Sequence, residues 1–189
     1  APHVEREEYL PRAKSGPWSD AMADGLWPLP RAAYRESPVV GLYFGAITRF
    51  LRWKNGRAEG TGWEYLLPTP TQWEKAARGV DARWFPWGDR FDYGLANSLF
   101  GRLQPGMGAN CLEPRGWFPT DESPFGLRDM AGGAVEFNEG YVRENLRTWT
   151  VIRGGSWATS SPVYYRATSR IIPESDVPTR GFRLVATRR

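Results

Sequence analysis

Aromatic residues set among glycines and prolines recur along this chain and constrain its fold more than any other feature. WFPWGD at 84–89 gathers two tryptophans and a phenylalanine around Pro86, which predicts an aromatic-packed turn. RGGSW at 153–157 places a glycine pair before a tryptophan that we expect in the core. With 10 Trp, 9 Phe, 8 Tyr, 21 Gly and 16 Pro, the chain is expected to be a loop-rich globule in which aromatic rings fill the space between irregular segments.

Two segments carry strong helix signals. TPTQWEKAARG at 69–79 has a threonine at the N-cap, a proline at the first helical position, a capping-box glutamine and a closing glycine. Apolar residues at helical spacing predict another helix over about 44–54, ending at Asn55-Gly56. Weaker helical character covers 4–14. We therefore expect helices mainly in the first half of the chain.

The second half changes to short strand-like pieces separated by glycine and proline turns. Strands are predicted at 149–153, 163–170 and 181–186. Helices followed by short strands and long loops indicate an α+β fold. The length of 189 residues fits a single domain over 1–189 that can bury a real core.

The scarcity of cysteine and histidine excludes several classes of site. Cys111 is the only cysteine, so an internal disulfide framework and a cysteine-rich zinc site are excluded. The only histidine, His3, lies near the beginning of the sequence. Histidine-based acid–base catalysis and multi-histidine metal sites are therefore nearly excluded.

The formal net charge of +4 does not by itself predict binding to nucleic acid. The basic residues are scattered, and no Lys/Arg tract with interleaved aromatics occurs, so a solvated surface with ion pairs is expected. Lysines number only three, and this arginine bias suits a GC-rich or heat-adapted (thermophile) source. No apolar run is long enough to predict a membrane span, and the acidic opening APHVEREE does not predict a secretory signal.

Six sequence blocks stand in a recognisable order over about residues 37–186. They are SPVVGLYFGAITRFLRW, LPTPTQWEKAARG, WFPWGD, SPFGLRDMAGGAVEF, VIRGGSW and RGFRLV. This ordered set resembles the formylglycine-generating-enzyme, or sulfatase-modifying-factor, family. The resemblance implies a C-type-lectin-like fold with a small twisted β core, two flanking helices and much irregular loop.

Two acidic residues around a glycine pair form a candidate cation site. Asp129 and Glu136 stand seven residues apart, and hard cations such as Ca²⁺ bind carboxylates together with backbone carbonyls. The family resemblance implies a structural calcium ion held by the side chains of Asp129 and Glu136 and the carbonyls of Gly132 and Ala134. Gly133 stands where asparagine is common in the family. The alternative from the residues alone is that the two acids cap turns or pair with arginine.

The GGSW turn is where the resemblance bears on catalysis. Copper-dependent oxidases of this family use two cysteines that follow the Gly-Gly-Ser-aromatic turn, and soft thiolates are the ligands that select Cu(I). By spacing, those positions are Thr159 and Tyr164 here, and neither side chain can act as such a ligand. The iron-dependent sulfoxide synthases of the family use histidine ligands that this chain lacks. We therefore expect a non-enzyme with no catalytic residue and no catalytic cofactor.

Residues 158–180, ATSSPVYYRATSRIIPESDVPTR, have the composition of a binding surface. Tyrosines offer large, rigid contact area, and serine and threonine offer adaptable hydrogen bonding. The residues expected to contact a ligand are Ala158, Thr159, Ser160, Val163, Tyr164, Tyr165, Ser169, Ile171, Ile172, Ser175, Asp176, Val177 and Thr179. The expected ligand is a protein or another macromolecule of unknown identity.

The same segment resembles the variable region of proteins from diversity-generating retroelements, which carry this fold. In those proteins the stretch between GGSW and GFR is rewritten by adenine-directed mutagenesis, which does not yield Lys, Gln, Met, Trp or Glu from adenine-rich asparagine codons. The first four do not occur between Ala158 and Arg180, and only Glu174 would need to be a fixed scaffold position. The resemblance implies a non-catalytic protein with a diversified ligand-binding surface. Three alternatives remain open: a divergent loop in a non-catalytic member, a sensor or accessory domain of a larger signalling protein, and a formylglycine-generating-type oxidase with a different site.

Overall fold

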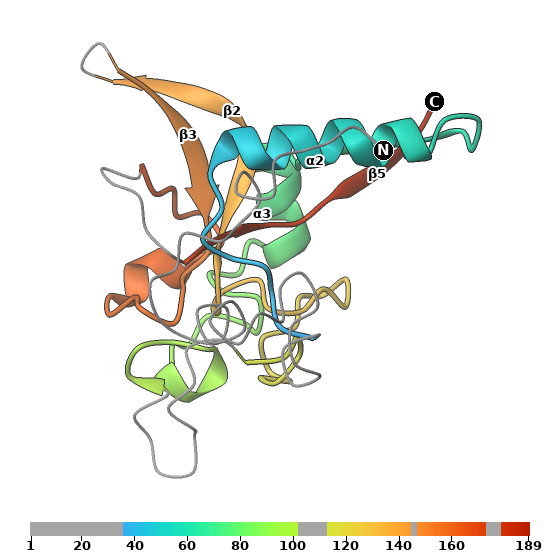
Figure 1. Cartoon of the computed structure of the whole chain (residues 1–189). Helices are drawn as coiled ribbons and strands as arrows, with labels where there is room; N and C mark the ends of the chain where they lie inside the picture. Colours follow the sequence, from blue (N-terminus) through green and yellow to red (C-terminus); the bar gives the residue numbers. More distant parts are fainter. Residues whose placement is uncertain (1–35, 102–112, 145–146, 173–178) are drawn as a thin grey trace, which may run out of the picture.

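The computed structural model describes residues 36–101, 113–144, 147–172 and 179–189 (Figure 1). Its helices are α2 (Phe44–Arg57), α3 (Pro70–Arg78) and the short 3₁₀ helices η3 (Tyr93–Leu95) and η5 (Pro162–Tyr165), and its strands are β1 (Trp63–Leu66), β2 (Val135–Glu144), β3 (Arg147–Arg153), β4 (Arg180–Phe182) and β5 (Val185–Arg188). This content confirms the α+β prediction. The helix predicted at 4–14 lies outside the described residues. Within the described ranges, no helix has both the length and the apolar character needed to cross a membrane.

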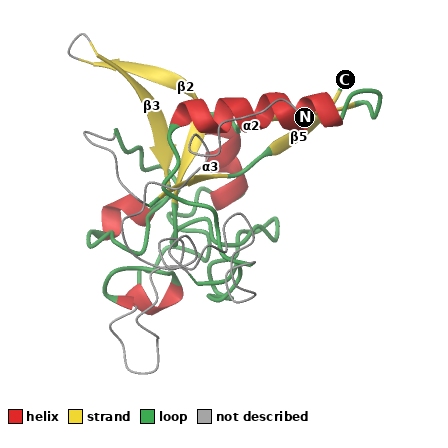
Figure 2. Ribbon diagram, in the orientation of Figure 1, coloured by secondary structure: helices red, strands yellow, loops and turns green. Residues whose placement is uncertain are grey.

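The strands form two small sheets. Strand β2 is central in the larger sheet, antiparallel to β3 on one side and parallel to β4 on the other. Strands β1 and β5 form a separate antiparallel pair, which brings the end of the chain back beside residues 63–66. Figure 2 shows that much of the remaining chain is loop.

The main hydrophobic core joins α2 to the larger sheet. Its buried members are Ile47, Leu67, Val135, Phe137 and Ile152. Phe44, at the start of α2, meets the edge of the Phe137 ring with centroids 5.9 Å apart. The sequence forms this core because helical spacing gives α2 one apolar face, while alternation along β2 and β3 points apolar side chains toward it.

Helix α3 has the caps that the sequence predicts. The Thr69 hydroxyl accepts the Gln72 N–H at 3.2 Å, and the Gln72 side chain accepts the Thr69 N–H at 2.9 Å. Gly79 follows the helix with a φ of 73°, a value that favours glycine. Trp73 lies fully buried on the inner face of the helix. The predicted helix over 69–79 is confirmed.

Helix α2 runs past the predicted stop at Asn55-Gly56 and ends at Arg57. The helix predicted over about 44–54 is confirmed, and its end lies one residue beyond the predicted stop. The Asn55 side-chain amide donates to the Tyr65 carbonyl and accepts the Tyr65 N–H, both at 2.8 Å. Asn55 therefore ties the end of the helix to β1.

The predicted strands have mixed outcomes. The segment 149–153 is confirmed as part of β3, and 181–186 is divided between β4 and β5, which belong to different sheets. The strand predicted at 163–170 is wrong, because the chain there turns through η5 and the following bends. Only Ile171 returns to pair with Ile152 of β3.

Candidate functional site

The RGGSW turn leads from β3 into the segment 158–172 and depends on its two glycines. Gly154 has a φ of 77°, and a Cβ there would lie 3.1 Å from the Met130 carbonyl oxygen. At Gly155 an added Cβ would lie 2.3 Å from the ring of Tyr165, so only glycine lets this ring pack against the turn. The Gly155 N–H donates to the Ala131 carbonyl at 2.9 Å, which fixes the turn on the loop below it.

That supporting loop, residues 130–133, is held by Asp121. The Asp121 carboxylate is buried and accepts the backbone N–H groups of Met130, Ala131 and Gly132 at 3.1 to 3.2 Å. Burial raises the pKa of Asp121 to about 7, although the backbone donors oppose this shift. Asp121 is therefore an internal support for the turn rather than an exposed acid.

Tyr165 is an anchor of the segment and not part of its exposed surface. Its side chain is 1% exposed, and its ring lies 5.5 Å from that of Phe91. The Tyr165 hydroxyl lies between the carbonyls of Ser156 and Thr159, at 3.0 and 2.5 Å. Burial raises the pKa of this phenol above its ordinary value. The prediction that Tyr165 contacts a ligand is wrong, as it is for Thr179, which is also buried.

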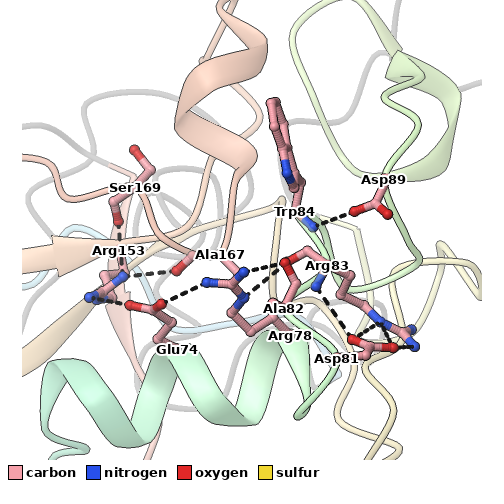
Figure 3. A network of polar contacts seen from close by, with 10 residues as sticks. All are labelled: Glu74, Arg78, Asp81, Ala82, Arg83, Trp84, Asp89, Arg153, Ala167 and Ser169. Carbon is pink, nitrogen blue, oxygen red and sulfur yellow. Dashed lines mark hydrogen bonds and ion pairs between the residues drawn. The ribbon is translucent and has the colours of Figure 1, made fainter.

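A buried arginine holds the other end of the segment (Figure 3). Arg153, 1% exposed, donates to the Ala167 carbonyl at 2.8 Å and to the Ser169 carbonyl at 3.3 Å. Its second guanidinium nitrogen reaches Glu74 of α3 at 3.2 Å. Burial lowers the pKa of Arg153, and the Glu74 carboxylate opposes that change. Sequence reasoning missed this pair, because 79 residues separate its members and nothing local marks them as partners.

Trp84 extends the surface beyond the residues predicted from the sequence. Its side chain is 49% exposed, and its carbonyl accepts the Ala167 N–H at 2.8 Å. The Arg166 guanidinium lies over the Trp84 ring, 3.9 Å from the centroid, in a cation–π contact. Asp89 holds the other side of Trp84 by accepting its backbone N–H at 2.9 Å (Figure 3). The WFPWGD block therefore borders the segment 158–172.

We call the exposed side chains of 158–172, together with Trp84, the recognition surface. Its members are Ala158, Ser160, Val163, Tyr164, Thr168, Arg170 and Trp84. Four other predicted contact residues, Thr159, Ser169, Ile171 and Ile172, are only partly exposed. Ile171 packs against the main core and exchanges backbone hydrogen bonds with Ile152 at 2.9 and 3.3 Å. It therefore belongs mostly to the frame, by which we mean the buried residues that hold the backbone of the segment in place. Ser175, Asp176 and Val177 lie outside the described residues.

The predicted calcium residues line a pocket of about 520 Å³. Both oxygens of the buried Glu136 carboxylate accept N–H groups from Arg183, and the Trp73 indole N–H also donates to it at 2.6 Å. Arg183 reaches the Asp129 carbonyl oxygen as well, at 3.0 Å. The Asp129 carboxylate accepts the Gly116 N–H at 2.7 Å, and burial raises its pKa.

This arrangement does not fit a calcium ion as it stands. The Glu136 carboxylate already accepts three N–H groups, and the Arg183 guanidinium neutralises its charge. In the part of the chain that the structure describes, no three His, Cys, Asp or Glu side chains are grouped so that they could hold a metal. A calcium ion at Asp129, Gly132, Ala134 and Glu136 would require Arg183 to move away, and the calcium site stays a prediction.

Comparisons with known proteins place this geometry in context. The chain is 27% identical to the mouse protein called inactive C-alpha-formylglycine-generating enzyme 2, over 99% of this chain and 62% of that protein. It is 33% identical to the formylglycine-generating enzyme of Mycobacterium tuberculosis, over 53% of this chain and 32% of that protein. The chain thus spans less than two thirds of the length of these relatives.

A solved structure and a family match agree on the fold. PvdO from Pseudomonas aeruginosa superposes with a TM-score of 0.62 at 23% identity, covering 81% of this chain and 62% of that one. The α+β fold of the formylglycine-generating type is therefore confirmed. The family described as the sulfatase-modifying factor enzyme 1-like domain matches residues 5–188. With nearly the whole sequence matched, the chain belongs to the sulfatase-modifying factor enzyme 1-like domain family.

Proposed function

We propose that this chain is a non-catalytic binding domain that uses the recognition surface to bind a macromolecule. The observation that carries the proposal is the chemistry at Thr159 and Tyr164, the positions that correspond by spacing to the thiols of copper-dependent family members. The Thr159 hydroxyl accepts the Ser156 N–H at 3.0 Å and lies 3.0 Å from the Ser156 hydroxyl. The Thr159 side chain therefore stabilises the turn, whereas Tyr164 is 43% exposed.

The separation between frame and surface supports a binding role. Gly155, Tyr165 and Arg153 fix the backbone through buried contacts, whereas Val163 and Tyr164 remain 51% and 43% exposed. Such a surface can vary in sequence without loss of the fold, because its side chains contribute little to the buried core. A diversified recognition segment, as in retroelement variable proteins, requires this property.

The names of the two relatives point in opposite directions on catalysis, so enzymatic activity is the deciding measurement. The mouse relative is named as inactive, whereas the Mycobacterium tuberculosis relative is named as an enzyme. The purified chain, supplied with Cu(I) and oxygen, is incubated with a cysteine-containing peptide, and formylglycine is sought by mass spectrometry. The mycobacterial enzyme serves as positive control. We expect no formylglycine, and turnover above the metal-only blank refutes the proposal.

The DNA sequence around the gene tests whether the recognition surface is diversified. We expect a reverse-transcriptase gene close by, together with a near-copy of the codons for 158–180 that differs only at adenines. If the neighbouring sequence holds neither, the surface is a fixed one, and the diversified part of the proposal fails while the binding part stands.

A further inference from the structure

A second pocket, of about 310 Å³, lies between the end of α2 and strand β1 and shares no residue with the recognition surface. Trp53, Lys54 and Arg57 come from α2, where three- and four-residue spacings put them on one face of the helix. Trp63 and Tyr65 come from β1, where two-residue spacing puts them on one face of the strand. We call these five residues the aromatic–cation pocket. Helix α2 contacts β1, and β1 in turn pairs with β5, which is labelled in Figure 1.

The pocket is rigidly built. Asn55, between the pocket residues of the helix, binds both backbone groups of Tyr65 at 2.8 Å and so fixes the strand against α2. On its other side β1 pairs with β5 over its whole length, with Trp63 opposite Arg188. The walls are therefore set by backbone contacts on two elements, which is the preorganisation that a binding site needs.

The charges in the pocket have one sign. Lys54 Nζ lies 4.5 Å from the centroid of the Tyr65 ring, and the Arg57 guanidinium lies 5.4 Å from that of Trp53. Among the described residues neither cation forms an ion pair, and no acidic residue lines the pocket. The neighbouring acid on the strand, Glu64, points to the opposite face by alternation and binds Arg189 at 2.9 Å.

Helix geometry explains only part of this arrangement. Basic residues are favourable in the last turn of any helix, because they face the negative end of its dipole. That effect accounts for Lys54 and Arg57, but not for Trp53 and Trp63, which are 49% and 41% exposed at the same place. Each indole lies beside a guanidinium, Arg57 at 5.4 Å from the Trp53 centroid and Arg188 at 5.3 Å from that of Trp63. The same place therefore offers aromatic surface for a flat ring and cations for a negative charge.

We propose that the aromatic–cation pocket binds a small organic anion with one flat ring system. The ring packs against the exposed parts of Trp53 and Trp63 that the guanidinium groups leave open, and the anionic group meets Lys54 and Arg57. The volume of about 310 Å³ is at the lower end of the range for small-molecule sites, so it suits one ring system with a short acidic arm. An aromatic carboxylate and a nucleoside monophosphate share this chemistry.

The test uses the indole N–H signals of the ¹⁵N-labelled full chain. Trp53→Phe and Trp63→Phe variants assign the two signals, and indole-3-acetate is titrated against the neutral indole-3-acetamide, then uridine 5′-monophosphate against uridine. We expect both indole signals to move with the anion of at least one pair, and about five- to tenfold weaker binding of its neutral partner. The anion that binds more tightly identifies the source of the ligand.

Charge variants provide the matched control. Lys54→Gln with Arg57→Gln removes the two pocket cations, whereas Arg52→Gln removes an exposed cation of α2 that does not line the pocket. We expect only the double variant to lose the preference for the anion. The proposal is overturned if no anion moves the two signals at millimolar concentration, if neutral partners bind equally, or if Arg52→Gln has the same effect. It is also overturned if the signals move only with protein concentration and sedimentation reports a dimer, because a second copy of the chain then covers the pocket.

Discussion

Two adjacent tyrosines give the sharpest test of how the recognition surface is built. Tyr164 is 43% exposed and Tyr165 is 1% exposed, although both occupy the same one-turn helix. Replacing each in turn by alanine removes the same atoms from opposite environments. If the surface and its frame are separate, as the structure indicates, only one of the two substitutions should affect stability.

The magnitudes follow from the contacts. Tyr165→Ala removes a buried ring packed on Gly155 and Phe91, and large-to-small changes of aromatic residues in a core cost about 3–5 kcal/mol. Tyr165→Phe removes only the hydroxyl. The two carbonyls it serves keep other donors, the Thr159 and Leu99 N–H groups, so this loss is about 1 kcal/mol. Tyr164→Ala should stay within about 0.5 kcal/mol of the parent.

Urea denaturation and calorimetry measure these differences. For a chain of this length, 1 kcal/mol corresponds to about 2–4 °C in melting temperature. We therefore expect a fall of roughly 6–20 °C for Tyr165→Ala, about 2–4 °C for Tyr165→Phe, and less than about 2 °C for Tyr164→Ala. The reasoning is refuted if Tyr164→Ala destabilises the chain as much as Tyr165→Ala, or if Tyr165→Ala is neutral.

Three further outcomes follow from the same structure. Gly155→Ala should lower the free energy of unfolding strongly, as measured in urea, because the new Cβ would lie 2.3 Å from the Tyr165 ring. Gly56→Ala, in open space within α2, should instead raise the free energy of unfolding by about 0.5–1 kcal/mol. Equal effects of the two substitutions would contradict the packing described. Because burial raises the folded-state pKa of Asp121 from 3.8 to about 7, its contribution to stability is complete below about pH 4 and falls as the pH rises to about 7, by on the order of 4 kcal/mol. The difference in free energy of unfolding between the parent and Asp121→Asn should vary over this pH window. A difference that does not change with pH would show that the Asp121 carboxylate has an ordinary pKa in the folded protein. Arg183→Met should lower the free energy of unfolding by about 3–5 kcal/mol, because it leaves the buried Glu136 carboxylate without its ion-pair partner. Calcium should raise the melting temperature of this variant but not that of the parent. A rise in the parent would show that calcium displaces Arg183.

Local signals in the sequence predicted those parts of the fold that depend on neighbouring residues. The capping box of Thr69 and Gln72 specifies the start of α3 within four residues, and the structure reproduces it. The sequence pattern does not reveal contacts with distant residues. Asn55-Gly56 marks the end of α2 to within one residue, but nothing local indicates that the Asn55 amide binds Tyr65, ten residues away.

The candidate site also has some features that the sequence specifies and others that depend on contacts between distant residues. Its position after the RGGSW turn and its lack of thiols are properties of the sequence, because chemistry depends on which residue types are present. Adjacent tyrosines are equivalent in composition, and only η5 decides that Tyr165 faces the glycine of the turn while Tyr164 faces outward. Likewise, the sequence places Glu136 in a calcium-type segment, but only the return of β4 brings Arg183 onto its carboxylate. Sequence determines what chemistry is available to this protein, and long-range packing determines which side chains remain accessible to perform it.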